Sequence, residues 1–222
     1  IKNKNILKIN KKPLIYYSIK VSKKTTKIKN TYVSTDSEKI KKISTYYGAK
    51  APFLRPKKIS KDRSTDLEFM KHFCMWYKKE KKIPIDLLIH LRPTTPFRNP
   101  KTINKAIDLM IKNRKYSSLR SFIVSDFSGY KLWLKKNKQA KVLVKTKKNY
   151  HSIGRQFIPK TYFHVGYVDI LRPRLTINKN TMIGKKVLFF ELNKNREYCI
   201  DIDTKEDLRK TYEWKKKHKY KI

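Results

Sequence analysis

Glycine, cysteine and acidic residues are scarce in this chain. Its 222 residues include 5 Gly, 2 Cys and 17 Asp or Glu. So little glycine, with only 9 Pro, excludes a collagen-like or linker-like protein. No apolar run approaches the ~18 residues that a membrane-spanning helix needs. The two cysteines, Cys74 and Cys199, lack the spacing of a metal site, and the 5 His are scattered. We therefore expect two reduced thiols, as in a cytoplasmic protein, and no zinc site.

Basic residues are abundant, with 57 Lys or Arg and a formal net charge of +40. One interpretation is a surface that binds a polyanion such as nucleic acid. The other is compositional drift, because Lys, Asn and Ile are over-used together and A/T-rich codons encode all three. The lysines are spread along the whole chain and form no single stripe, which favours drift. With 39% hydrophobic residues, the chain can still bury a substantial core.

The apolar pattern alternates between helix and strand along most of the chain. Helices are expected at 13–22, 37–47, 67–77 and 102–112 and from 205 onward, and strands at 31–35, 85–91, 118–126, 185–192 and 198–204. Such an order with short connections is typical of an α/β protein with a mostly parallel sheet covered by helices. The lysine-rich segment 129–184 breaks the alternation. We expect it to form a small inserted subdomain, with the α/β core made of residues 1–128 and 185–222.

Two of the few acidic residues, Asp201 and Asp203, stand at the end of the apolar run in "REYCIDIDTKEDL". On a strand, residues i and i+2 project from the same face. Ligands bind at the carboxyl edge of open parallel sheets. Two carboxylates there suit Mg²⁺, which takes one or two of them and completes its shell with phosphates and water. The alternative is that Asp203 caps the following helix.

A second strand-end cluster is "HLRPTTPFR", residues 90–98. Its prolines rigidify the turn, Thr94 and Thr95 line it, and Arg92 and Arg98 can each bind carboxylate or phosphate in a forked geometry. "APFLRP", with Arg55, and "KDRSTD", residues 61–66, form a weaker patch that could contact a base or a phosphate. "VSTD" adds Asp36 at a further strand end, where capping is its simplest role.

These motifs, with "KNILKINKKPLIYYSIK" before them, resemble the acylneuraminate cytidylyltransferases (CMP-sialic acid synthetases) and their relatives that act on legionaminic-type nonulosonic acids. The resemblance runs from Lys4 to about Leu208. It implies a Rossmann-like nucleotidyltransferase fold in a homodimer, with 129–184 as the dimerisation subdomain. It also implies a reaction in which the anomeric hydroxyl of the sugar attacks the α-phosphorus of CTP, so that pyrophosphate leaves and a CMP-sugar forms.

The resemblance also assigns roles to individual residues. Lys4 and Asn5 match a Lys-Asn pair that meets the nucleotide, and Lys4 is expected to be catalytic. The positions that match those near the cytidine and its phosphates are Arg55, Ser64 and Thr65. The positions on the loop that faces the sugar are Arg92, Thr94, Thr95 and Arg98. Asp201 and Asp203 match the catalytic pair that binds Mg²⁺. Arg155 resembles an arginine that one subunit donates to the site of its partner.

The sequence departs from the family pattern in two ways. The first strand and its phosphate loop, of the type Ala-Arg-Gly-Gly-Ser-Lys, do not precede Lys4, so we expect a missing N-terminus and weak activity or none for this chain alone. On the sugar side, Arg92 replaces a frequent Gln, and Val165-Gly166 replaces Asn-Gly, which favours a nonulosonate other than N-acetylneuraminate. Three alternatives remain: a non-catalytic remnant of the fold, a basic nucleic-acid-binding protein, and an enzyme for the eight-carbon acid Kdo, which the "PTTPFR" loop fits less well.

Overall fold

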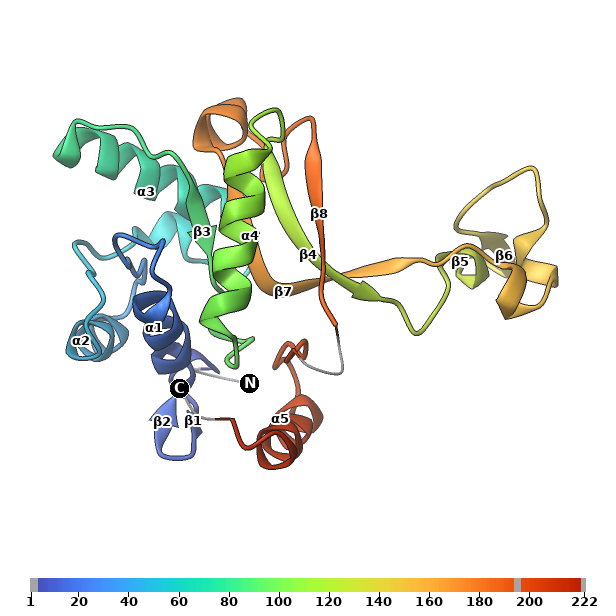
Figure 1. Ribbon diagram of the computed structural model, residues 1–222, viewed down its shortest axis with the longest axis horizontal. Coiled ribbons are helices and arrows are strands. Elements are labelled where there is room, and N and C mark those ends of the chain that lie inside the picture. Colours follow the sequence, from blue (N-terminus) through green and yellow to red (C-terminus); the bar gives the residue numbers. More distant parts are fainter. Residues whose placement is uncertain (1–3, 194–196, 221–222) are drawn as a thin grey trace.

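The computed structural model describes residues 4–193 and 197–220. Its centre is a four-stranded sheet in the order β3-β7-β4-β8 (Figure 1). The strands are β3 (Leu88–His90), β4 (Ser118–Val124), β7 (Tyr162–Leu171) and β8 (Val187–Glu191). β4 pairs in parallel with β8, whereas β7 is antiparallel to both β3 and β4. The prediction of an α/β fold with a sheet flanked by helices is confirmed, and the sheet is mixed because β7 returns along β4.

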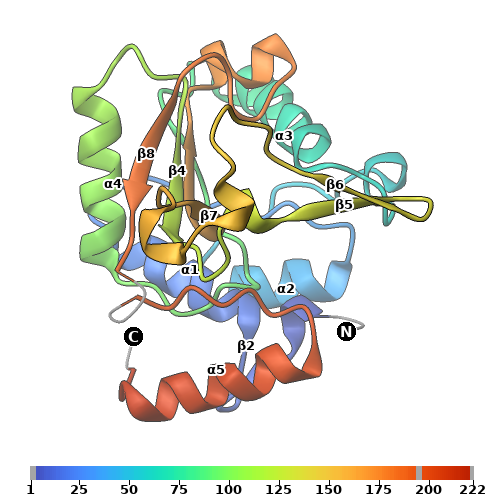
Figure 2. The same cartoon turned by 90° about the vertical axis from the view of Figure 1, so that its right-hand side faces the viewer.

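Helices cover the two faces of this sheet (Figure 2). α1 (Leu14–Lys24) and α4 (Pro100–Lys112) share one hydrophobic core with Leu119 and Ile170 of the strands. On the opposite face, Met70 of α3 (Asp66–Lys81) packs with Leu171. Successive residues of a strand point to opposite faces, so Ile170 and Leu171 serve different cores. The helical pattern of 102–112 predicted the inward residues correctly, since Ile103, Ala106, Ile107 and Met110 are all buried.

Local sequence explains where several helices begin and end. Asn99 caps α4 through a hydrogen bond that its side chain accepts from the backbone of Lys101, and Pro100 occupies the first turn. Ser37 caps α2 (Glu38–Tyr46) in the same way. The chain then turns at Gly48, whose φ of +87° favours glycine. Thr65 and Glu68 form a reciprocal capping box at the start of α3.

The two ends of the described chain pack together below the sheet (Figure 2). The strands β1 (Lys8–Ile9) and β2 (Lys12–Pro13) are joined by a tight turn, in which Asn10 and Lys11 both have positive φ. Ile9 and Tyr17 bury themselves against Tyr198 and Ile202, and Trp214 of α5 (Lys205–Lys217) covers this cluster. The C-terminal helix thus fixes the segment 198–204 against the N-terminal part of the chain.

Two of the expected strands do not form as predicted. Segment 31–35 makes two isolated parallel bridges, Tyr32 to Lys50 and Thr35 to Leu54, and no longer ladder. Segment 198–204 has no strand at all within the described residues. Its apolar side chains are buried against the aromatic cluster below the sheet, so their alternation reflects packing and no neighbouring strand pairs with them.

The expected subdomain boundary also needs correction. β7 lies within 129–184, yet it is an inner strand of the main sheet. The part that projects is the segment between β4 and β7, residues 125–161, which we call the arm (Figure 1). It carries a hairpin of β5 (Trp133–Lys136) and β6 (Gln139–Val142). The chain therefore leaves the sheet at the end of β4, forms the arm, and returns as β7 antiparallel to β4. The lysine-rich sequence of 129–184 did not indicate that β7 belongs to the main sheet.

No helix in the described part of the chain is long and apolar enough to cross a membrane.

Candidate functional site

The site lies where the loop after β3, the middle of β7 and the segment 198–204 meet. β7 bulges strongly there. Between the cross-strand pairs Arg120–Asp169 and Phe122–His164, β4 has one residue and β7 has four, 165–168. The hydroxyl of Ser121 holds this bulge, because it lies 2.9 Å from the carbonyl oxygen of Val165 and accepts a 3.1 Å hydrogen bond from the backbone of Val168. The bulge turns Gly166 out of the sheet and toward the loop.

Three predicted site residues surround Gly166. A methyl group at its Cα would lie 3.0 Å from Thr95 Oγ1, 3.4 Å from Arg92 Cδ and 3.6 Å from Asp201 Oδ2. Thr95 is fully buried, and its hydroxyl has no hydrogen-bond partner among the described residues. The structure thus brings Arg92, Thr95 and Asp201 together around Gly166, where even a methyl group would be closely surrounded.

Arg98, predicted to face the sugar, points into the protein and is 1% exposed. Its guanidinium donates to the backbone oxygens of Tyr167 at 2.5 Å, Arg92 at 2.7 Å and Gly166 at 3.0 Å. A further bond of 3.0 Å reaches the hydroxyl of Ser18. Burial lowers the pKa of Arg98 to about 10, so it remains charged at neutral pH. In this position Arg98 fixes the loop and the bulge to each other from the interior of the protein.

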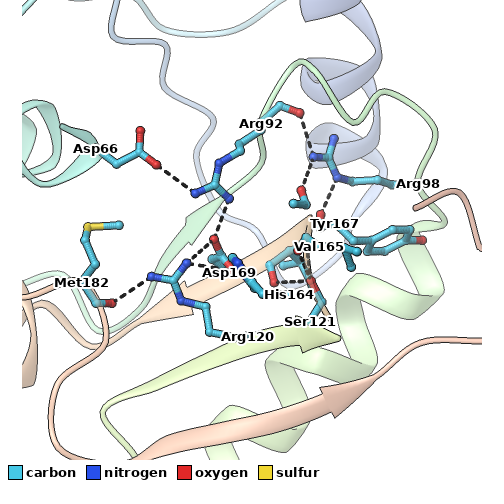
Figure 3. A network of polar contacts seen from close by, with 12 residues as sticks. Asp66, Arg92, Arg98, Arg120, Ser121, His164, Val165, Tyr167, Asp169 and Met182 are labelled. Atoms are coloured by element: carbon cyan, nitrogen blue, oxygen red, sulfur yellow. Dashed lines mark hydrogen bonds and ion pairs between the residues drawn. The ribbon is translucent and has the colours of Figure 1, made fainter. Parts of the chain in front are cut away.

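Arg92 is held between two carboxylates (Figure 3). Its Nη1 lies 2.7 Å from Asp169 Oδ2 and its Nη2 lies 2.8 Å from Asp66 Oδ2. Asp169 also accepts from Arg120 at 2.7 Å and lies 2.9 Å from His164 Nε2. Burial opposes the ionisation of Asp169, but the hydrogen bond with His164 and the charges of Arg120 and Arg92 outweigh it and lower the pKa of Asp169 to about 2. The carboxylate is therefore ionised at any physiological pH.

This network joins residues that sequence reasoning missed, namely Asp66, Arg120, His164 and Asp169. Asp66 and Asp169 bind Arg92 directly. Arg120 and His164 bind Asp169 (Figure 3). A signal was present, because Arg120 and Asp169 each interrupt an apolar strand, in "SLRSFIV" and "GYVDIL". Charged residues are rarely buried unless they are paired, so two opposite charges in two such strands pointed to a buried pair.

The side chains of Asp201 and Asp203 point in different directions. Asp201 faces Gly166, whereas Asp203 forms an ion pair of 2.5 Å with Lys4 Nζ. The segment is fixed to the loop after β3, because the backbone of Ile202 donates to the carbonyl oxygen of Thr94 at 3.0 Å. Thr204, and not Asp203, caps α5. Asp203 is 67% exposed at its side chain, so its carboxylate is accessible next to Lys4.

Among the residues predicted to contact the nucleotide, Lys4 reaches the aspartate pair through its ion pair with Asp203. Asn5 belongs to the short 3-10 helix Lys4–Ile6. Arg55 donates to Ser60 at 2.9 Å, pairs with Asp36 at 3.6 Å and lies over the ring of Phe69. Ser64 and Thr65 have local contacts, since Ser64 accepts from the backbone of Lys61 and Thr65 caps α3. Arg55 reaches the N-terminal part of α3, whose first residue is Asp66, the partner of Arg92.

Arg155 lies on the arm. Its Nη2 donates to the backbone oxygen of Asp126 at 2.6 Å, and the side chain is solvent-exposed. The arm extends away from the sheet, so Arg155 does not belong to the group around Gly166 in its own chain (Figure 1).

The mixed sheet with helices on both faces is an arrangement found in Rossmann-like nucleotidyltransferases. A solved structure of CMP:2-keto-3-deoxy-manno-octonic acid synthetase complexed with CTP shares this fold, with a TM-score of 0.69 and 14% identity over 98% of this chain and 93% of that one. A family model described as cytidylyltransferase matches residues 1–221. The chain belongs to this cytidylyltransferase family, which confirms the resemblance predicted from the sequence.

Curated relatives match over most of the chain. Post-translational flagellin modification protein B of Campylobacter coli is 27% identical over 201 residues, which span 90% of this chain and 84% of the relative. Pseudaminic acid cytidylyltransferase of Campylobacter jejuni subsp. jejuni serotype O:23/36 (strain 81-176) is 28% identical over 211 residues, or 94% of this chain and 87% of the relative. CMP-N,N'-diacetyllegionaminic acid synthase of Legionella pneumophila is 30% identical over a shorter stretch of 106 residues, 48% of this chain and 45% of the relative.

Proposed function

We propose that the protein transfers CMP from CTP to the anomeric hydroxyl of a nonulosonic acid and releases pyrophosphate. The observation that carries this proposal is the convergence of Arg92, Thr95 and Asp201 on Gly166, beside the Lys4–Asp203 pair, whose aspartate is exposed. The arginine suits the carboxylate of a sugar acid. The lysine and the aspartates suit a nucleotide with its cation. The names of the relatives point to the same reaction.

In the proposed reaction, the anomeric oxygen of the sugar forms a bond to the α-phosphorus while the bond from that phosphorus to the pyrophosphate oxygen breaks. Negative charge accumulates on the phosphate oxygens during this exchange. Lys4 is a cation that can turn from Asp203 toward these oxygens, because its side chain is 25% exposed. The hydroxyl of Thr95 is buried next to Gly166 and has no hydrogen-bond partner among the described residues. We propose that it helps to orient the sugar.

Asp201 and Asp203 are the proposed Mg²⁺ ligands. Among the described residues no three His, Cys, Asp or Glu side chains form a cluster that could hold a metal. Asp201 faces Gly166 and Asp203 faces Lys4, so a cation shared by both requires one of the two side chains to rotate. Substrate phosphates and water would supply the remaining oxygens of Mg²⁺. When bound, the cation would neutralise phosphate charge. Because Asp203 pairs with Lys4, we propose that Lys4 and the cation compete for this carboxylate.

The function is tested by pyrophosphate release from CTP, measured on the full natural chain with a panel of sugar acids. Pseudaminic acid, N,N'-diacetyllegionaminic acid, N-acetylneuraminic acid and Kdo form the panel. We expect release that depends on CTP, on Mg²⁺ and on one of the three nonulosonic acids. A preference for Kdo would instead assign an eight-carbon sugar acid as the substrate. Failure of every acid on the panel would contradict the proposed reaction.

We further propose that the protein works as a homodimer in which the arm contacts the second copy. Apolar side chains on and beside the arm are unusually exposed, for example Phe127 at 77%, Phe157 at 71% and Phe163 at 63%. Exposed apolar groups concentrated in one region mark an interaction surface. Arg155 is two residues from Phe157 and is exposed, so an arm that contacts the second copy can carry this arginine to it.

Phe157→Asp tests the dimer. Because this side chain is 71% exposed, the substitution should leave the fold intact and place a charge in the proposed contact. We expect the mass in sedimentation equilibrium to fall from two chains to one at micromolar concentration. The matched control is Tyr46→Asp on α2, which is 82% exposed and lies outside the arm. A monomeric wild type, or equal masses for both variants, would refute the proposed interface.

A further inference from the structure

The two carboxylates that hold Arg92 differ in how firmly they are fixed. Asp169 is fully buried, whereas the side chain of Asp66 is 41% exposed. Arg92 itself is 24% exposed at its side chain, and its Nε donates to no group in the described part of the chain. A guanidinium has five N–H donors, so Arg92 can bind a further anion without losing both present partners.

Asp169 is a permanent partner. One of its oxygens receives both Arg92 and Arg120, and the other lies 2.9 Å from His164 (Figure 3). Removal of this carboxylate from the network would leave the side chain of Arg120, 10% exposed, without its ion pair. Buried charges stay paired because water cannot replace the lost partner. Asp169 therefore keeps Arg92 in place whether or not a ligand is bound.

Asp66 is a replaceable partner. In the described part of the chain its carboxylate bonds to Arg92 Nη2 alone. Exposed ion pairs contribute little to stability because water solvates both charges after they separate. Asp66 is also the first residue of α3, where the helix dipole stabilises a negative charge that faces solvent. Rotation of Asp66 into water thus frees one edge of Arg92 at small cost.

We propose that Asp66 is a placeholder that the carboxylate of the sugar acid displaces from Arg92. The proposal rests on the proposed function, which supplies a ligand with a carboxylate. Asp66 and the ligand then compete for the same edge of the guanidinium. Asp66 lowers the apparent affinity for the ligand and keeps the arginine charge neutralised while the site is empty. A ligand without a negative group at this point cannot displace Asp66.

The surroundings of Arg92 favour an incoming anion. Arg98, buried below the loop, is charged and bonds three carbonyl oxygens and one hydroxyl, with no carboxylate in direct contact among the described residues. The negative charge of Asp201 favours the charged form of Arg98 at longer range, against the larger effect of burial. Once Asp66 turns away, Arg92 and Arg120 share the single carboxylate of Asp169, which leaves a positive excess that the carboxylate of the ligand balances.

The test is Asp66→Asn in the full natural chain, with KM measured separately for the preferred sugar acid and for CTP. We expect KM for the sugar acid to fall by roughly 3–10-fold, while KM for CTP stays within twofold. Asp66→Glu retains a competing carboxylate and should return KM toward the wild-type value. The matched control is Asp86→Asn, which removes an exposed carboxylate elsewhere and should change neither constant.

A second ligand separates the proposed exchange from a general change of charge. The methyl ester of the same sugar acid has no carboxylate, so its KM should be alike in the wild type and in Asp66→Asn. An unchanged or raised KM for the free acid in Asp66→Asn would overturn the placeholder while leaving the proposed function intact. If the wild type uses no nonulosonic acid, the proposed function fails. Calorimetry then measures whether the free acids bind, and so tests the displacement of Asp66 independently of turnover. Binding that Asp66→Asn does not tighten, or no binding, overturns it.

Discussion

Asp203→Asn should lose turnover by at least about 100-fold, because it removes one of the two carboxylates proposed to hold Mg²⁺ near the phosphates of CTP. The fold should be unaffected, since Asp203 is 67% exposed at its side chain and Thr204 caps the following helix. The measurement is kcat for pyrophosphate release at saturating CTP and sugar acid. Magnesium affinity, measured by calorimetry on the protein without substrates, should fall in parallel and provides a readout apart from turnover.

Glu206→Gln is the control for this result. It removes a carboxylate three residues further along, which is paired with Arg209 on the surface of α5, and it should leave kcat unchanged. Wild-type turnover in Asp203→Asn would remove the aspartate pair from the mechanism. The proposed exchange between Lys4 and the cation would then have no basis either.

Asp169→Asn should destabilise the protein by about 3–5 kcal/mol, the cost of breaking a buried ion pair by removing one partner. Two arginines, Arg92 and Arg120, lose their shared carboxylate. For a chain of this size the loss corresponds to a Tm lower by roughly 10 °C in calorimetry. The control Asp108→Asn breaks an exposed pair with Lys27 and should cost at most about 1 kcal/mol. Equal losses in the two variants would contradict the structural role of Asp169.

The same carboxylate should make stability depend on acid pH. The pKa of Asp169 in the folded protein is about 2, below its value in the unfolded chain. Its contribution is therefore complete above about pH 4 and is lost as the pH falls through 2. Asp169→Asn should accordingly flatten the acid limb of the stability profile.

Features encoded in a short stretch of sequence were predictable. The loop "HLRPTTPFR" indicated a site because its prolines, hydroxyls and arginines stand together, and the structure brings Arg92 and Thr95 beside Asp201. The inward residues of α4 followed from their helical spacing. The composition of the loop and the helical spacing are local features, whereas the contact of the loop with Asp201 depends on a distant segment, which is fixed by the hydrogen bond from Ile202 to Thr94.

Features that depend on distant pairing were missed or misread. The sequence predicted Arg98 to bind a ligand. Its burial could not be foreseen, because it depends on carbonyl groups that the distant strand β7 supplies. The partners of Arg92 come from α3 and β7, and no local pattern links "STD" at 64–66 with "YVDI" at 167–170. Segment 198–204 has the alternation of a strand, but it packs on aromatic rings instead of a neighbouring strand.

In the bulge, four residues of β7 lie opposite one residue of β4. The regular strand pairs on either side of the bulge hold Arg120, His164 and Asp169, whereas the bulge itself holds Gly166. Arg120 and Asp169 are paired on one side of it, and Phe122 and His164 on the other. Residues 165–168 between them are spanned by the hydroxyl of Ser121 and carry Gly166. Val165, Tyr167 and Val168 belong to the hydrophobic core, whereas Gly166 is half-buried and faces Arg92, Thr95 and Asp201. A substitution at Gly166 therefore changes the space next to these three side chains, while the ion pairs of Asp169 lie outside the four residues. Libraries that aim to change the acceptor of this enzyme should begin there.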